Sequence, residues 1–144
     1  MVTVGIIGAG RIGKVHTESI CNYVRNAKIK TVADPFMNEA TEKWLLSMGV
    51  EGTTKDYHEI LSDPQIDAVL ICSSTNTHSP ISLEAIAAGK HVFCEKPDAV
   101  SVEEAQKMKE ASEKYGKVLM VMRNNRYYEP SVFLKDYINA GKMG

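Results

Sequence analysis

Three glycines near the start of the chain have the spacing of a phosphate-binding turn. Gly8, Gly10 and Gly13 follow an apolar stretch and precede a stretch that can form a helix. Gly8 would permit a tight turn, Gly10 would let the backbone approach a pyrophosphate, and Gly13 would let the helix pack closely on the strand. Helix N-termini favour anions through free N–H groups and the helix dipole. The turn therefore predicts a dinucleotide site that also includes Arg11 and Ile12.

Two other kinds of turn are less consistent with these glycines. A P-loop ends in G-K-[ST], because its lysine and hydroxyl serve terminal phosphates and magnesium, and this ending is absent here. An ordinary glycine-rich turn between a strand and a helix is the structural alternative. The apolar strand before the turn, the helix after it and a downstream acid favour nucleotide binding.

Asp34 is that downstream acid, about 20 residues beyond the turn. It ends a run rich in β-branched residues, and the following Pro35 makes an Asp-Pro turn after a second strand. A carboxylate here accepts hydrogen bonds from both ribose hydroxyls of an adenosine and repels a 2′-phosphate. Asp34 can also cap the turn, and the two roles are compatible. We therefore expect NAD, rather than NADP, as the cofactor.

The composition indicates one soluble α/β domain over residues 1–144. The chain is 44% hydrophobic and 24% charged, with a net charge of −1, so we expect no nucleic-acid or membrane partner. The first apolar run, Val2–Ile7, is too short for a signal peptide or a membrane span, and a cytoplasmic location is expected. Neither histidines nor cysteines have metal-ligand spacing, so no metal site is predicted. Cys21, Cys72 and Cys94 are expected to be reduced and buried, with Cys94 in the core rather than acting as a nucleophile.

Apolar strands alternate with helical stretches, as in a doubly wound parallel sheet. The predicted strands are Val2–Ile7, Lys28–Ala33, Asp67–Cys72, His91–Cys94 and Val118–Met122. The predicted helices are Ile12–Val24, Asn38–Met48, a short Asp56–Leu61, a helix from Ser79-Pro80 to Gly89, one from Ser101 to Gly116, and Pro130–Ala140. Ligands bind such sheets at the carboxyl ends of the strands, so we expect one cleft there. Its loops would be Gly8–Gly13, Asp34–Met37, Ser73–His78, Glu95–Asp98 and Arg123–Glu129.

Two of these loops carry polar groups suited to a cofactor and to proton transfer. One is the run SSTNTH, from which we predict cofactor contacts by Ser73, Ser74, Thr75, Asn76 and His78; a solvated loop with local hydroxyl turns is the alternative. The other contains Glu95 and Lys96, which strand alternation points to opposite sides. A lysine that faces the cleft without the neighbouring acid would lie near the positively charged ring of an oxidised nicotinamide. Its pKa would then be lowered, and it could deprotonate a substrate hydroxyl. A surface lysine before a turn is the alternative interpretation.

The motifs together resemble the glucose–fructose oxidoreductase / inositol dehydrogenase / rhizopine-catabolism (Gfo/Idh/MocA) family. They are G-x-G-R-I-G, Asp34, S-S-T-N-T-H, G-K-H-V-F-C-E-K-P and N-R-Y-Y-E-P, and the inositol 2-dehydrogenase branch is the most similar. The resemblance implies a Rossmann fold and NAD(P)-dependent oxidation of a sugar or cyclitol hydroxyl. It assigns Lys96 as the catalytic lysine, adds Glu95, Lys96 itself and Arg126 to the cofactor site, and implies a cis Lys96-Pro97 bond. Tyr127 replaces an arginine of the usual N-R-R-[FY]-D-P segment.

A second departure concerns the length of the chain. Family members continue into a second α/β domain, which supplies an aspartate and a histidine that act with the lysine and which forms most oligomer contacts. That substrate and oligomerisation domain is absent here, so this chain is interpreted as an isolated cofactor domain or a truncated relative with negligible turnover. A homo-oligomer is expected only with the second domain. A non-catalytic, NAD(P)-binding regulatory or redox-sensing module is the alternative function.

Overall fold

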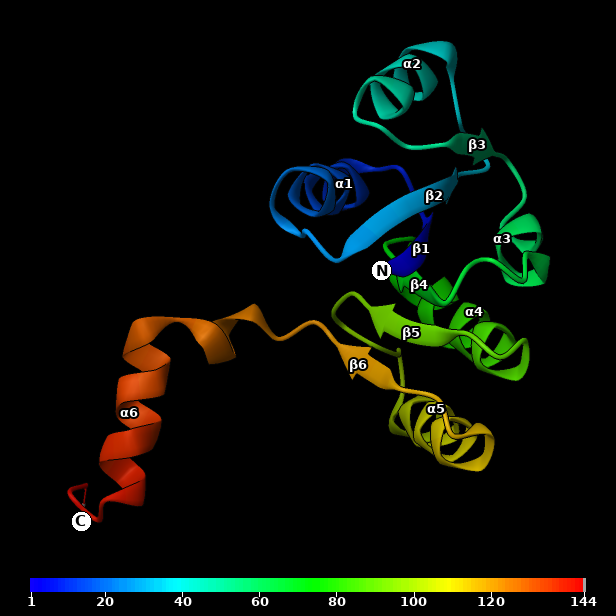
Figure 1. The fold of residues 1–144 in the computed structure, drawn as a ribbon. Coiled ribbons are helices and arrows are strands. Elements are labelled where there is room, and N and C mark those ends of the chain that lie inside the picture. Colours follow the sequence, from blue (N-terminus) through cyan, green and yellow to red (C-terminus); the bar gives the residue numbers. More distant parts are fainter. Residues whose placement is uncertain (144) are drawn as a thin grey trace.

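Six parallel strands form a single sheet in the computed structural model, which describes residues 1–143. Their spatial order is β3-β2-β1-β4-β5-β6 (Figure 1). The strands are β1 (Val2–Ile7), β2 (Ala27–Ala33), β3 (Gly52–Thr54), β4 (Ala68–Ile71), β5 (His91–Cys94) and β6 (Leu119–Val121). The chain runs outward from β1 in one direction and, from β4, in the other. The predicted doubly wound Rossmann fold is confirmed, with its switch point between β1 and β4.

Helices cover both faces of the sheet (Figure 1). They are α1 (Arg11–Tyr23), α2 (Glu39–Ser47), α3 (His58–Ser62), α4 (Thr75–Ala87), α5 (Val102–Tyr115) and α6 (Glu129–Asn139), with a 3-10 turn, η1, at Asn124–Tyr127. One buried cluster joins the sheet to α2 and α1, through Leu45 and Ile20. A second joins it to α3, α4 and α5, through Ile60, Ile86 and Met108. Burial of these side chains is the main force that fixes helices to a sheet.

The beginning of α4 differs from the expectation. We predicted a helix from Ser79-Pro80, but α4 begins at Thr75, with Ser74 at its N-cap position and Pro80 inside it. Pro80 is exposed and lacks only one intrahelical donor, whereas Ile81 and Ile86 are buried in the core. Packing therefore outweighs the proline signal, and most of the expected polar loop is the first turn of this helix.

Other local signals agree with the structure, with two exceptions. The Ser101 hydroxyl accepts a hydrogen bond from the Glu104 N–H, and Gly116 ends α5 with a φ of 62°. Strand β3 was not predicted, because three half-buried residues carry too short a pattern. Cys72 and Cys94 are buried, but Cys21 is exposed on α1, contrary to expectation. Burial raises the pKa of the Cys94 thiol to about 11, which disfavours the nucleophilic thiolate.

The last helix stands apart from the sheet. Figure 1 shows η1 and α6 extending away from β6, and apolar side chains of α6 such as Phe133 and Ile138 are 64% and 56% exposed. The predicted helix over 130–140 is confirmed at Glu129–Asn139. Across residues 1–143, none of the helices combines the length and apolar character needed to span a membrane.

The contact between α1 and β1 yields the first prediction. A β-carbon placed on Gly13 would lie 1.9 Å from the Gly8 carbonyl oxygen, so Gly13→Ala must displace backbone. We expect it to lower the free energy of unfolding by about 3 kcal/mol or more, as measured by urea denaturation. Gly10→Ala is the matched control, because its β-carbon would meet nothing within 4 Å. Equal stability of the two variants would contradict this packing argument.

Candidate functional site

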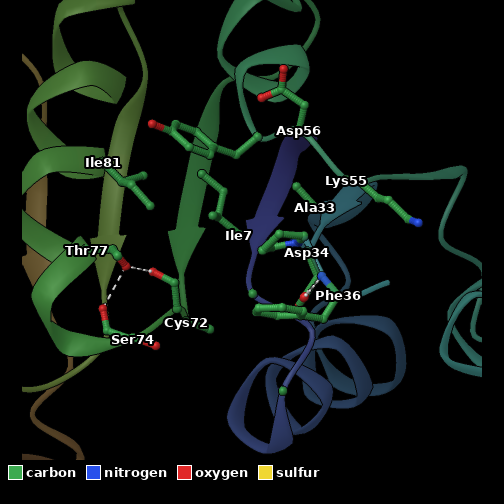
Figure 2. A pocket seen from close by; sticks show the side chains of 15 residues that line it. Ile7, Ala33, Asp34, Phe36, Lys55, Asp56, Cys72, Ser74, Thr77 and Ile81 are labelled. Carbon is green, nitrogen blue, oxygen red and sulfur yellow. Dashed lines mark hydrogen bonds between the residues drawn. The ribbon is translucent and has the colours of Figure 1, made fainter. Parts of the chain in front are cut away.

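A cavity of about 590 Å³ lies at the carboxyl ends of the central strands (Figure 2). Its size is typical of small-molecule sites, and its position matches the switch point of the sheet. The lining comes from the glycine turn, the end of β2, the segment after β3 and the start of α4. The residues are Ile7, Gly8, Gly10, Ala33, Asp34, Pro35, Phe36, Lys55, Asp56, Tyr57, Cys72, Ser73, Ser74, Thr77 and Ile81.

The glycines of the turn serve different purposes. Gly8 has a φ of 104°, and a β-carbon there would lie 2.7 Å from the Cys72 backbone, so the fold itself requires this glycine. Gly10 has an ordinary φ of −70°. A β-carbon on Gly10 would contact nothing within 4 Å, and the residue faces the cavity. Neither backbone nor packing requires a glycine at position 10, which is consistent with a space kept open for a bound pyrophosphate.

Asp34 connects the glycine turn to the end of β2. Its Oδ2 accepts a 2.7 Å hydrogen bond from the Ala9 N–H. Its Oδ1 accepts a 2.8 Å bond from the Phe36 N–H, which Figure 2 shows. The carboxylate therefore caps the turn after β2, as expected for one of its two roles. Each carboxylate oxygen has a further lone pair, so Asp34 retains acceptor capacity toward the cavity that it lines.

The start of α4 presents hydroxyl groups to the same cavity. Ser73, Ser74 and Thr77 line it, and the Thr77 hydroxyl lies 2.7 Å from the Ser73 hydroxyl and from the Ser74 carbonyl (Figure 2). Thr75 and Asn76 were predicted to contact a cofactor but are not among the lining residues. Thr77 belongs to the polar loop that was expected to line the cleft, but it was not named among the individual contact residues. A helix beginning at Thr75 would have singled it out, because positions 74, 77 and 81 share one helical face.

His78 has a different environment from the one expected. The side chain is 2% exposed and does not line the cavity. Its Nδ1 lies 2.7 Å from the Pro97 carbonyl and its Nε2 lies 3.0 Å from the Ser73 carbonyl. A neutral imidazole can donate to one of these carbonyls and an imidazolium to both. With both ring nitrogens so occupied, the ring connects the start of α4 to the segment after β5 and does not reach a ligand in the cavity.

Glu95 and Lys96 point in opposite directions, as strand alternation predicted. Glu95 is buried, its Oε1 lies 2.8 Å from His16 Nε2, and its Oε2 accepts a 2.9 Å bond from the Lys96 N–H. The Lys96 side chain is exposed. The Lys96-Pro97 peptide bond is cis, as the resemblance implied. The two neighbours of Lys96 are thus both tied to helices, Glu95 through its carboxylate to His16 of α1 and Pro97 through its backbone carbonyl to His78 of α4.

The remaining predicted residues lie outside the cavity. Arg11 is exposed, and Ile12 packs against the core beneath α1. Arg126 is exposed in η1 beside a separate hollow lined by Asn125, Ser131 and Lys135. The structure therefore does not bring Arg126 to Asp34. Conversely, Lys55, Asp56 and Tyr57 line the cavity and were not predicted, because they follow the unpredicted strand β3; Phe36 lines it as part of the expected loop Asp34–Met37.

Comparisons with known proteins agree with this architecture. The chain is 38% identical over 144 residues to a myo-inositol 2-dehydrogenase of Thermotoga maritima, covering 98% of this chain and 42% of that protein. It is 38% identical over 143 residues to YrbE, an uncharacterized oxidoreductase of Bacillus subtilis, covering 99% of this chain and 41% of the other. The chain thus spans well under half the length of these relatives.

A solved structure and a family model extend the comparison. A Lactobacillus casei scyllo-inositol dehydrogenase with bound NAD(H) and scyllo-inositol superposes with a TM-score of 0.91 at 27% identity, covering all of this chain and 42% of the other. The family model described as an oxidoreductase family with an NAD-binding Rossmann fold matches residues 2–123. This chain therefore belongs to the Gfo/Idh/MocA oxidoreductase family, through the NAD-binding Rossmann domain of that family.

Proposed function

We propose that this chain is the NAD-binding part of a dehydrogenase that oxidises a CH–OH group of a sugar or cyclitol. One observation carries the proposal: Gly10, which nothing in the fold requires to be glycine, opens onto the same cavity as Asp34. A dinucleotide needs a pyrophosphate site and a ribose acceptor within one cavity, and these two residues offer both. The two inositol dehydrogenases named above support a cyclitol as the substrate class.

The chain's own groups would bind the cofactor as follows. Backbone N–H groups at the start of α1 face the pyrophosphate position beside Gly10, where the positive end of the helix dipole adds to their effect. Asp34, already oriented by Ala9 and Phe36, accepts the adenosine ribose hydroxyls and disfavours a 2′-phosphate. Hydroxyls at Ser73, Ser74 and Thr77 are available from the opposite wall. When bound, NAD supplies the hydride acceptor.

Lys96 is the proposed proton-transfer group. It lies just beyond the carboxyl end of β5, on the edge of the sheet where substrates of doubly wound enzymes react. Because Glu95 is turned inward to His16, its carboxylate does not pair with the Lys96 ammonium, which stays exposed for a substrate oxygen. The amine can then donate a hydrogen bond to that oxygen or accept its proton.

Substrate turnover is expected to need groups that these 144 residues do not supply. Catalysis requires the reacting carbon to be held close to its partners, and positioning of this kind is worth many orders of magnitude in rate. Lys96 is exposed and is not among the residues that line the cavity beside Asp34. We therefore propose that the chain alone binds NAD and turns over negligibly.

Substitution of Gly10 tests the binding proposal. Gly10→Val places a branched side chain where the pyrophosphate would approach, so NAD affinity should fall by about 100-fold, equivalent to losing one or two charge-assisted hydrogen bonds. Isothermal titration calorimetry measures the change, and circular dichroism checks folding. Gly52→Val is the matched control, because its side chain also enters open space, at the first residue of β3. Undiminished NAD binding by Gly10→Val would reject this phosphate site.

Substitution of Lys96 tests the catalytic proposal. In the chain as it stands, Lys96→Ala should leave NAD affinity within about twofold, because Lys96 is an exposed residue outside the cavity. In a protein extended by the substrate domain, the same change should lower NADH formation from myo-inositol about 10²- to 10⁴-fold. Robust activity of the short chain would contradict the need for further groups. NAD binding without turnover in the extended protein would favour a non-catalytic, redox-sensing module.

A further inference from the structure

We propose that Lys55 is a second cofactor-specificity residue, which receives a 2′-phosphate beside Asp34. In this arrangement only the Asp34 carboxylate excludes NADP. The cation that would bind the 2′-phosphate of NADP, Lys55, is already present. The inference rests on the proposed function, since it concerns the same nucleotide site. It adds a residue that directly follows β3, a strand that the sequence did not reveal.

Sheet register brings Lys55 next to Asp34. Ala33 of β2 pairs with Thr54 of β3, and the Asp34 N–H donates a 3.0 Å hydrogen bond to the Thr54 carbonyl. Lys55 follows the last residue of β3, so Asp34 and Lys55 leave neighbouring parallel strands at the same edge. Both line the cavity, and Figure 2 shows Lys55 on the side where Asp34 and Phe36 lie, with its flexible side chain extended away from Asp34.

Lys55 is also available to bind an anion. It is the sole cation among the fifteen residues that line the cavity. Its ammonium group makes no hydrogen bond or ion pair with any residue in the described range 1–143, and the side chain is exposed. A lysine carries a compact charge on a flexible four-carbon stem, so it can follow a phosphate over several ångströms.

The neighbouring acid does not cancel this charge. The Asp56 Oδ1 accepts hydrogen bonds from the His58 N–H at 3.0 Å and lies 2.6 Å from His58 Nδ1. In Figure 2 its carboxylate points away from Asp34. His58 also lies 3.4 Å from Glu84 of α4, and the hydrogen bond to Asp56 raises the His58 pKa. Asp56 is thus paired on the α3 side, which leaves Asp34 as the carboxylate that opposes a 2′-phosphate.

The two charges have opposite effects on a phosphorylated ribose. Asp34 accepts the free hydroxyls of NAD but repels a 2′-phosphate. Lys55 attracts the phosphate and has no corresponding group to bind in NAD. Removing Asp34 should therefore reverse the cofactor preference only while Lys55 is present. Removing Lys55 alone should affect NADP and leave NAD unchanged.

A set of variants of the 144-residue chain tests this inference by calorimetric titration with NAD and NADP. Lys55→Met should weaken NADP binding about fivefold, the size of an exposed charge pair, and leave NAD affinity within about twofold. Asp34→Ser should make NADP the tighter ligand. In the double variant Asp34→Ser/Lys55→Met, NADP should no longer be the tighter ligand. The difference in NADP affinity between the single variant Asp34→Ser and the double variant should shrink as the salt concentration is raised, because exposed charges are screened.

Lys28→Met is the matched control, since Lys28 lies near the amino end of the neighbouring strand β2, at the opposite edge of the sheet from Lys55, and its loss changes the net charge equally. Asp34→Asn replaces Asp34→Ser if the latter fails to fold, because the amide oxygen still accepts one of the two N–H groups. Equal effects of Lys55→Met and Lys28→Met on NADP, or an undiminished reversal in the double variant, would overturn the role of Lys55. Failure of the unsubstituted chain to bind either nucleotide would instead reject the proposed function, and the inference with it.

Discussion

The close contact between the first turn of α1 and the end of β1 determines how the rest of the site is built. The Gly13 backbone lies against the Gly8 carbonyl, so closely that a single methyl group would overlap it. This contact directs the free N–H groups of α1 toward the carboxyl ends of the strands. Ala9, in the same turn, donates to the Asp34 carboxylate at the end of β2. Backbone packing thus fixes the relative positions of the glycine turn and Asp34, the two groups to which the proposed function assigns the pyrophosphate and the ribose.

The same edge of the sheet connects this nucleotide site to Lys96 through buried polar contacts. His16 extends from α1 to Glu95, and His78 extends from α4 to the Pro97 carbonyl. Buried polar groups are costly unless they are paired, so these contacts hold the segment around Lys96 in one arrangement. Each histidine is on a helix whose N-terminal end contributes to, or borders, the cavity. The position of Lys96 therefore depends on the same helices that form the nucleotide site.

The sequence predicted the architecture and placed Gly8, Gly10 and Asp34 on one cleft, where the structure finds them, but it failed where packing overrides a local signal. Long apolar runs identified five strands, and the spacing of Gly8, Gly10, Gly13 and Asp34 carries a physical requirement that sequence alone can express. Ser79-Pro80 was misleading because burial of the following apolar residues extends α4 across a proline. Strand β3 was too short to detect, and Lys55 and Tyr57 were lost with it. Thr77 was not singled out within the polar run, because it faces the cavity only when the run forms the first turn of α4.

The sequence reveals groups that act through the backbone more readily than side chains whose roles depend on distant elements. Residues of the glycine turn act through the backbone, so their spacing in the sequence is itself the signal. The surroundings of other side chains depend on elements at sequence distances that no motif specifies. This is the case for Lys55 and Thr77, which line the cavity, and for His78. His78 illustrates the difference, since its place in a polar run indicated a ligand contact, whereas the fold gives both of its ring nitrogens to backbone carbonyls. In this domain the motif identifies the class of cofactor, whereas the register of the short edge strand β3 brings Lys55, which no motif indicates, to the cavity that Asp34 lines.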